Sequence, residues 1–374
     1  MRRFPRGIYE IWLCNSYGAR VAALWPVRSL TYSVGDPVQQ VGQLSVKVAS
    51  RWRQQAAIAS LIEVWRSPMP GIWPRHEGTF ILETVEQDRD GLTLGGSHTT
   101  KLLDFRIVDA DKDSGGANKT GAVDDLIKRF GREQLAALAG AGRDFNAWFP
   151  FAVEPDYGLG PTVSKEASRA GLLDTAQGLV KAASEHDNYP GWVTFEVANT
   201  GHDLQFGVVL RTHYDYRGVD RGITSISPLV LSDGTALGNV KRVQDHTREK
   251  TVALVGGAGS GPGRTKVTVT DAIRAGAAPW WRRETWVDGG SEETNTAVLK
   301  EKGERKLRDG RPIDRFTASL LPHPVIMYGV NLAWGDKVGV EAFGRIWNSR
   351  VTGVSVSANE RDEKIDLKLE AVGT

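Results

Sequence analysis

Apolar and polar residues alternate with a period of two along much of the first hundred residues and again near the end of the chain. Residues 78–98 hold one alternating segment, a charged turn at 88–91 and a second alternating segment. Residues 351–374 repeat this pattern around a charged run at 360–364. A period of two that is broken by turn residues is typical of a β-hairpin. We therefore predict one hairpin in each passage.

Other short alternating segments fill the chain up to about residue 108. A further hairpin is expected around the turn residues 15–18, and the region closes with KLLDFRIV at 101–108. Several short strands separated by turn signals predict a small barrel or sandwich. The remaining expected strands are RSLTYSV, GQLSVKVAS and SLIEVWRS.

The apolar period changes from 2 to 3.6 after a polar linker at 109–120. DDLIKRFGREQLAALAG and EASRAGLLDTAQGLVKAASEH carry apolar residues at helical spacing, and each predicts an amphipathic helix. Asp124 and Asp125 lie near the start of the first, where the helix dipole favours negative charge. Alternation returns in WVTFEVAN and LQFGVVLRTHYDY. The pattern therefore predicts an α/β insertion after the first β region.

A second insertion is expected from about residue 240 to 312. It contains the strands TVALVG and TKVTVT, and a helix in EETNTAVLKEKGERKLRDG with Leu299 and Leu307 on its apolar side. RFTASLLP, residues 336–343 and the final hairpin then complete the chain. The predicted order is a β unit, an α/β insertion, and a second β unit interrupted by another insertion.

Composition narrows the class of protein. The chain has 374 residues, with 47 Lys plus Arg and 45 Asp plus Glu, so its formal net charge is only +2. This balance argues against a dedicated nucleic-acid-binding protein. The single cysteine, Cys14, allows no intramolecular disulfide and no cysteine-ligated cluster, and it suits a reducing cytoplasm. Arg6, Glu10 and Arg20 interrupt any apolar signal segment, and no apolar run reaches about 18 residues, so we expect neither a signal peptide nor a membrane-spanning helix.

The glycine-rich stretch GGAGSGPGR at 256–264 is the most conspicuous chemical motif. Gly256 and Gly261 have the spacing of a phosphate-binding loop, but Pro262 stands where that loop needs lysine. Pro262 also occupies the third glycine position of a dinucleotide-binding motif and removes a backbone N–H. We therefore predict a plain loop between two strands.

The seven histidines offer two candidate pairs for catalysis or metal binding. His213 lies two residues before Asp215, and His186 is adjacent to Asp187. We favour a structural or solvated role for both pairs, because such neighbours occur by chance at strand ends. No nucleophile elbow and no obvious carboxylate dyad is present, although folding can bring distant carboxylates together.

The stretch PWWRRETW at 279–286 combines three tryptophans with two arginines. Such a combination can form a stacking platform for a polymer, and Trp and Arg are also enriched in protein interfaces. Without a basic excess elsewhere in the chain, we favour packing within the protein, then a protein interface, then a polymer ligand.

The order of these elements resembles the tail-hub and tail-tip proteins of siphophages that infect Gram-positive hosts, a family related in fold to the baseplate hubs of contractile tails. The likeness covers most of the chain and rests on four stretches in sequence. They are GTFILETVEQDRDGLTLGGSHTTKLLDFRIV, then RGVDRG at 217–222 after the Phe206-Gly207-Val208 strand, then RRETWVDGG, and finally MYGVNLAWGDKVGVEAFGRIWNSRVTGVSVSANERDEKIDLKLEAVG.

The resemblance implies a mainly β fold with α/β insertions, made of two related small β-barrel hub domains and two inserted subdomains. The first barrel would span 1–108, and the α/β insertion 109–200. The second barrel would combine 201–239 with 313–374, and the second inserted subdomain would be 240–312. The hairpin at 351–374 would then complete the second barrel as the hairpin at 78–98 completes the first.

The resemblance also implies a structural virion component rather than an enzyme. Such a protein is assembled in the host cytoplasm, forms a homotrimeric ring at the tail tip, joins the sixfold tail tube to the threefold tip and frames the channel for DNA ejection. The implied partners are the distal tail protein ring, the tail tube, the tape measure protein, and a central fibre or receptor-binding proteins. We expect no catalytic residue, cofactor, metal, specific nucleic acid or membrane span.

Two alternative functions remain open from the sequence. One is a hydrolase of cell-wall or surface glycans whose carboxylates meet only in the fold. The other is a carbohydrate-binding tail protein that uses exposed tryptophans such as Trp280 and Trp281.

Overall fold

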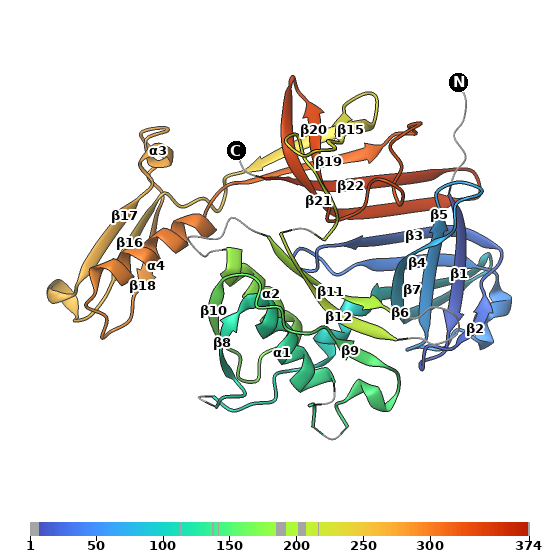
Figure 1. Ribbon diagram of the computed structural model, residues 1–374, viewed down its shortest axis with the longest axis horizontal. Helices are drawn as coiled ribbons and strands as arrows, with labels where there is room; N and C mark the ends of the chain where they lie inside the picture. Colours follow the sequence, from blue (N-terminus) through green and yellow to red (C-terminus); the bar gives the residue numbers. More distant parts are fainter. Residues whose placement is uncertain are drawn as a thin grey trace. The chain divides into compact units, whose positions relative to one another are not determined.

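The computed structural model describes residues 7–112, 114–136, 138–140, 142–184, 192–200, 207–215 and 217–372. The chain divides into two compact units (Figure 1). The larger comprises Met1–Ser184, Gly191–Lys241 and Phe316–Thr374, and the smaller comprises Glu185–Pro190 and Arg242–Arg315.

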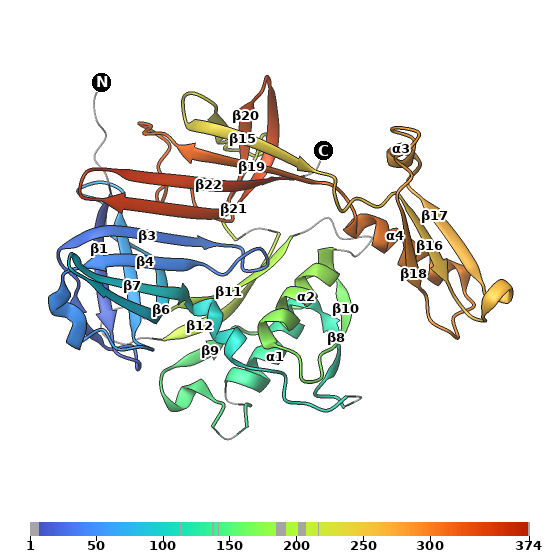
Figure 2. The same cartoon turned by 180° about the vertical axis from the view of Figure 1, so that it is seen from behind.

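A mostly antiparallel sheet of 14 strands organises the larger unit and takes strands from both ends of the chain (Figures 1 and 2). The path of hydrogen-bonded neighbours is β15-β19-β22-β21-β3-β4-β7-β6-β5-β1-β2, and β13 and β14 join it through β20. The prediction of a mainly β fold is confirmed. The strands are β1 (Ile8–Cys14), β2 (Arg20–Ala23), β3 (Val27–Gly35), β4 (Gln43–Val48), β5 (Leu61–Ser67), β6 (Arg75–Asp88), β7 (Gly91–His98), β13 (Asp220–Arg221), β14 (Val230–Ser232), β15 (Leu237–Asp245), β19 (Ile313–Leu320), β20 (Lys337–Ala342), β21 (Arg345–Asn359) and β22 (Glu363–Ala371).

Both hairpins predicted from the repeated pattern are present. Strands β6 and β7 pair antiparallel from Phe80↔His98 to Asp88↔Gly91. Strands β21 and β22 pair in the same sense, and their turn lies between Asn359 and Glu363. The expected hairpin of β1 and β2 is also formed. Alternation of apolar and polar residues was therefore a sufficient signal for each of these local pairings.

The two predicted groups of strands meet at one seam, where β3 pairs antiparallel with β21. The register runs from Ser29↔Asn359 to Gly35↔Gly353. The sequence predicted two separate barrels, whereas the described residues form one sheet, and none of the strand pairings among them closes that sheet into a ring. The difference has a simple cause: a period of two fixes which face of a strand is buried, but it does not specify the neighbouring strand.

One hydrophobic core serves both ends of the chain. Tyr32 and Phe80 come from the first hundred residues, and Phe316 and Trp347 come from the last sixty. All four are buried, and the ring centroids of Phe316 and Trp347 lie 5.2 Å apart. Because the core is shared, the strands at the two ends of the chain stabilise one another by burial of apolar surface.

The α/β insertion contains both predicted helices, α1 (Val123–Leu135) and α2 (Leu172–Ser184). They contact each other, and α1 also contacts β12, so their apolar sides are buried. None of the helices in the described ranges is long and apolar enough to cross a membrane. The insertion also has two small sheets, β10-β8 and β11-β12-β9, built from β8 (Asn118–Ala122), β9 (Phe151–Val153), β10 (Thr162–Glu166), β11 (Val193–Asn199) and β12 (Val208–Tyr214), and a short 3₁₀ turn, η3 (Phe145–Ala147).

The segment KLLDFRIV does not continue the β region as predicted. Residues Thr99–Phe105 form a 3₁₀ helix, η2, whose N-terminus is capped by the His98 side chain accepting from the Thr100 N–H. Leu102 and Leu103 are consecutive and both buried. In a strand with one exposed face, consecutive side chains point alternately to the core and to solvent, so this segment does not fit a strand. The cap and this pair of buried neighbours explain why the chain turns here. Earlier in the chain, another 3₁₀ helix, η1 (Ser50–Gln54), follows β4.

The smaller unit is a three-stranded sheet, β17-β16-β18, covered by one helix. Its core contains Val255, Val269, Leu299 and Leu307, so the predicted apolar side of the helix is confirmed. The glycine-rich stretch forms the predicted loop between β16 and β17. The elements are β16 (Val252–Gly256), η4 (Gly261–Gly263), β17 (Lys266–Thr270), α3 (Ala272–Ala275), β18 (Glu284–Asp288) and α4 (Thr296–Asp309).

Candidate functional site

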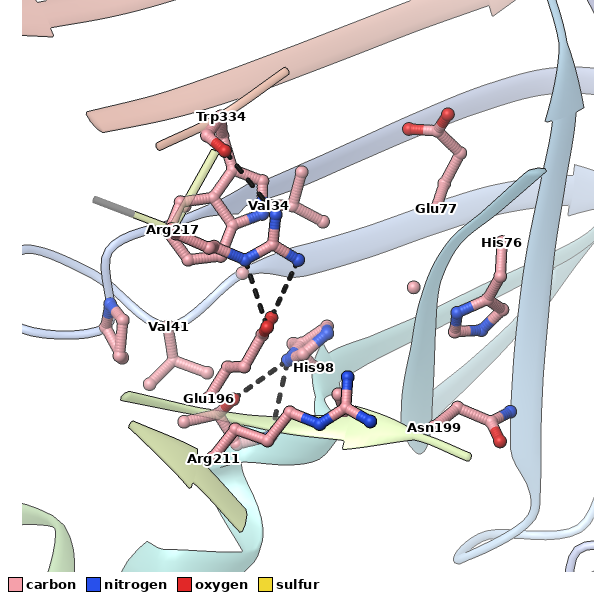
Figure 3. Close-up of a pocket in the computed structure, with 16 residues that line it drawn as sticks. Val34, Val41, His76, Glu77, His98, Glu196, Asn199, Arg211, Arg217 and Trp334 are labelled. Atoms are coloured by element: carbon pink, nitrogen blue, oxygen red, sulfur yellow. Dashed lines mark hydrogen bonds and ion pairs between the residues drawn. The ribbon is translucent and has the colours of Figure 1, made fainter. Parts of the chain in front are cut away.

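A pocket of about 180 Å³ opens in the larger unit, between the first group of strands and the β11–β12 pair (Figure 3). Strands β3, β6 and β7 supply one side, and β11 and β12 supply the other. Its wall is unusually rich in charged and imidazole side chains. The lining residues are Val34, Gly35, Pro37, Val41, Gly42, His76, Glu77, Gly78, His98, Thr100, Glu196, Ala198, Asn199, Arg211, Arg217 and Trp334.

Glu196 is the buried anion of this pocket. Arg217 donates to both of its carboxylate oxygens, from Nε at 3.0 Å and from Nη2 at 2.9 Å, and His213 Nε2 lies 2.9 Å from Oε1. Burial alone would raise the pKa of Glu196, but the Arg217 charge and the His213 contact outweigh burial and lower it well below its usual range. Glu196 therefore remains ionised, and both of its oxygens are already engaged.

Of the candidate pair His213 and Asp215, the fold places His213 against a different carboxylate. His213 belongs to β12 and faces Glu196 on the neighbouring strand β11. Asp215 leaves the strand in a left-handed conformation, with φ of 66°. Its backbone N–H donates to Trp192 O, and its carbonyl accepts from Arg350. The other candidate pair, His186 and Asp187, lies outside the described residues.

Glu77 is the second carboxylate of the pocket, and its environment is the opposite of that of Glu196. Burial raises the pKa of Glu77 above its ordinary value, against the opposing effect of a 2.7 Å hydrogen bond from the Tyr328 hydroxyl. Two carboxylates with opposite pKa shifts are a pattern seen in acid–base catalysis. Here, however, Arg217 and His213 engage both oxygens of Glu196, so this pair lacks a free nucleophile. The pocket gives no support to the hydrolase alternative.

His98, the last residue of β7, presents a neutral imidazole. Burial lowers the pKa of His98 to about 4. The Thr100 N–H lies 3.3 Å from Nδ1 and donates to it, and the Thr100 hydroxyl is 3.0 Å from the same nitrogen. Since Nδ1 is an acceptor, the ring proton sits on Nε2, which is a donor. The ring also packs edge-on against Phe80, with centroids 5.6 Å apart.

Arg211 brings a guanidinium into the pocket and forms an ion pair with Glu154, which does not line the pocket. It lies opposite Glu196 in the β11–β12 register, and its side chain extends into the pocket toward Asn199 (Figure 3). The side chain is 42% exposed, and Nε is 3.5 Å from Glu154 Oε1. Within the described ranges, the Arg211 terminal nitrogens have no hydrogen bond. Sequence reasoning missed this residue, and its only local signal is a charged residue that follows three buried apolar ones in VVLR.

The stretch at 279–286 is divided between packing and exposure. Trp281 Nε1 donates to Glu249 Oε2 at 2.9 Å, and the Arg283 guanidinium lies 4.1 Å from the Trp281 ring centroid. Trp280, by contrast, is 76% exposed. Packing, the favoured interpretation, therefore holds for Trp281 and not for its neighbour. In the described part of the chain, no group of three or more His, Cys, Asp or Glu side chains is arranged to hold a metal ion.

Comparison with known proteins decides the family. A family model described as Siphovirus ReqiPepy6 Gp37-like protein matches residues 74–369. The chain belongs to this family of phage tail proteins. The match covers the β6–β7 hairpin, nearly all of the β21–β22 hairpin and most of the second predicted β unit, and of the first unit it covers residues 74–108. It confirms the resemblance that the sequence motifs suggested. No curated protein matches the chain.

Solved structures extend this relationship to the fold as a whole. The tail protein from Neisseria meningitidis MC58 is similar with a TM-score of 0.58 and 12% identity, over 97% of this chain and 96% of that one. The 43 kDa tail protein of prophage MuSo2 from Shewanella oneidensis gives 0.55 and 11%, over 96% and 98%. Prophage tail protein gp18 from Listeria monocytogenes EGD-e gives 0.51 and 12%, over 96% and 94%. At such low identity the likeness establishes a shared fold over nearly the full length of each chain.

Proposed function

We propose that the chain is the tail hub of a siphophage: a homotrimeric ring at the tail tip that joins the sixfold tail tube to the threefold tip and frames the channel for DNA. The observation that carries this proposal is the seam between β3 and β21. The seam and the shared core hold two strand groups, each containing a hairpin of the same pattern, in one body. Three such bodies present six strand groups, which is what a threefold ring needs to match a sixfold tube.

In this proposal each strand group is one of the two related hub domains, and the two are joined in one open sheet. The first spans residues 1–108, and the second combines 201–239 with 313–374; residues 109–200 and 240–312 are the inserted subdomains. Strand β12 is the exception, because it lies within 201–239 but pairs with β11 and β9 of the α/β insertion. Strand β2 is the last strand at one end of the sheet path in the described chain, and β15 is the last at the other. An open sheet edge is a hazard that proteins usually cover. Neighbouring copies in a closed ring would cover both edges by contacts between two different surfaces.

The proposed partners follow from this position in the virion. They are the distal tail protein ring and tail tube on one side, a central fibre or receptor-binding proteins on the other, and the tape measure protein in the channel. The formal net charge of +2 suits a channel that DNA traverses, because strong neutralisation of phosphates would hold the DNA in place. Assembly would take place in the host cytoplasm, and the mature location would be the tail tip.

The first test is the mass of the purified protein by light scattering after gel filtration. We expect a species of three 40.9 kDa chains and, in electron micrographs, a threefold ring with a central opening. The charged variant Val21→Glu in edge strand β2 should shift the mass toward one chain. Its matched control is Ile273→Glu on α3, an equally drastic change at an exposed apolar position of the smaller unit, which should leave the trimer intact.

A single-chain mass both alone and after mixing with a distal tail protein would contradict the proposal. Equal effects of Val21→Glu and Ile273→Glu on the mass of the assembly would also contradict it, because the edge strand β2 would then have no special role in closing the ring.

A glycan-binding tail protein is the second candidate, and the exposure of Trp280 favours it over the hydrolase. An exposed indole offers a flat apolar face on which a sugar ring can stack. Binding on a glycan array should be lost in Trp280→Ala and kept in Trp73→Ala, a control at another exposed tryptophan. Absence of any glycan signal from the unmodified protein would remove this candidate. Trp281→Ala is unsuitable as a test because Trp281 packs against Glu249 and Arg283.

A further inference from the structure

The polar groups of the pocket leave an excess of hydrogen-bond donors. Arg217 and His213 satisfy Glu196, and Tyr328 donates to Glu77. After these internal partners are assigned, the terminal nitrogens of Arg211 and the Nε2–H of His98 are available as donors among the described side chains of the wall, while Arg211 Nε lies 3.5 Å from Glu154. Both are groups that bind anionic oxygen well, and a guanidinium can hold a carboxylate through two parallel hydrogen bonds.

The rest of the wall restricts the size and charge of such an anion. Val34 and Val41 line the pocket with apolar surface (Figure 3), and Pro37 is a further apolar lining residue. A volume of about 180 Å³ holds a few non-hydrogen atoms and not an extended ligand. The two glutamates that also line the pocket would repel a doubly charged group such as phosphate more strongly than a single negative charge. A singly charged head on a short aliphatic stem therefore fits this wall.

We propose that this pocket binds a carboxylate on a short aliphatic stem, with Arg211 and His98 holding the carboxylate and the apolar wall covering the stem. This site is independent of the hub proposal, because it depends only on groups within one chain. The same chemistry is available from two sources. One is a free short-chain carboxylic acid, and the other is the glutamate side chain of a protein that contacts the tail protein.

The test uses saturation-transfer NMR with propionate as the probe and propionamide as its uncharged control. We expect saturable millimolar binding of propionate, no comparable binding of propionamide, and binding at least tenfold weaker in Arg211→Gln, since a charge-assisted hydrogen bond is worth about a factor of ten or more. The matched control is Arg129→Gln, which removes an exposed guanidinium from α1 and should not change propionate binding.

A second pair of probes identifies the source. N-acetyl-glutamate-N-methylamide binding more tightly than propionate, with its glutamine analogue inactive, would assign the site to a protein side chain. Binding of propionate alone would assign it to a free acid. Propionate that does not saturate below about 50 mM, or that binds equally to Arg211→Gln or equally as the amide, would overturn the proposal. If Arg211→Gln does not fold, as judged by its melting curve, Arg211→Lys takes its place, because lysine keeps the charge and loses the two-pronged geometry.

Discussion

The two hairpins that share a sequence pattern differ in what their charged turns do. At the turn of β6–β7, Asp88 pairs with Lys47 at 2.8 Å, and the two side chains are 54% and 26% exposed. At the turn of β21–β22, Glu363 pairs with Arg66 at 2.9 Å, and the side chains are only 10% and 3% exposed. The same arrangement of charges is therefore a solvated contact in one hairpin and a buried one in the other.

The buried pair connects strands that are far apart in the sheet. Arg66 belongs to β5 and Glu363 to β22, which are not neighbours along the strand path. Arg66 also donates from Nη1 to Tyr328 O at 2.9 Å, and the Tyr9 hydroxyl of β1 hydrogen-bonds to Glu363. The charges of a turn therefore do not show, in the sequence, whether they will be solvated or buried in the fold. The role depends on which strand the rest of the fold brings to it.

Removing Arg66 should produce the largest effect on this contrast. We expect Arg66→Met to reduce the free energy of unfolding by about 3–5 kcal/mol, because it leaves the Glu363 carboxylate buried without its counter-ion. Urea unfolding followed by tryptophan fluorescence measures the change. The double variant Arg66→Met, Glu363→Met should recover much of the loss, since no unpaired charge then remains. A loss near zero in the single variant would show that the Arg66–Glu363 pair does not stabilise the contact between β5 and β22.

Apolar truncation in the two hairpins should give comparable losses. Leu94 in β7 and Leu367 in β22 are both buried in the shared core. Leu94→Ala and Leu367→Ala should each lower the free energy of unfolding by about 2–5 kcal/mol through lost burial and cavity formation. Both should shift the same urea transition. A separate, earlier transition confined to Leu367→Ala would mean that the final hairpin unfolds independently and that the core is not shared.

Acid should weaken the contribution of Glu363 selectively. Burial alone would raise the pKa of Glu363, but the hydrogen bond and charge of Arg66 outweigh burial and lower it. Its stabilisation is therefore fully present above the ordinary glutamate pKa of about 4.3, and it is lost as the pH falls through the lower folded value. The measurement is the difference in unfolding free energy between the unmodified protein and Glu363→Gln from pH 7 to pH 3. The difference should stay level above about pH 5 and shrink below pH 4; a level difference throughout would contradict the assignment.

Removing Lys47 should have the smallest effect. Because the Lys47–Asp88 pair is solvated, Lys47→Met should leave the urea midpoint unchanged within error. The same substitution to methionine is used at position 66, so the two variants form a matched pair. A loss similar to that of Arg66→Met would abolish the distinction between the two turns.

Local pattern was enough to predict the hairpins, the two helices of the α/β insertion and the loop at 256–264. In each case the signal lies within about twenty residues, because the period of buried positions and the turn residues are local properties. The same reasoning failed at KLLDFRIV, where buried Leu102 and Leu103 are adjacent in a 3₁₀ turn. There the His98 side chain accepts from the Thr100 N–H and begins a 3₁₀ helix where we expected the strand to continue.

Most contacts of the candidate site could not be predicted from the sequence. The lining of the pocket runs from Val34 in β3 to Trp334, and the Arg66–Glu363 pair outside the pocket joins residues separated by 297 positions. No local period records such distances, since they are fixed by which strands pair and how the sheet curves. The position of the Arg211 guanidinium is equally a property of the assembled pocket, because it pairs with Glu154 and lies opposite Glu196, which Arg217 holds.

The seam also orders events during synthesis. Strand β3 is complete once Gly35 has been made, but its partner β21 ends at Asn359. Until then one edge of β3 has no native partner, and the loop that must close to supply one spans more than three hundred residues. Non-local pairings of this kind form slowly, and unpaired edges invite aggregation. We therefore expect that the open edge of β3 must be kept apart from other chains until β21 has been made.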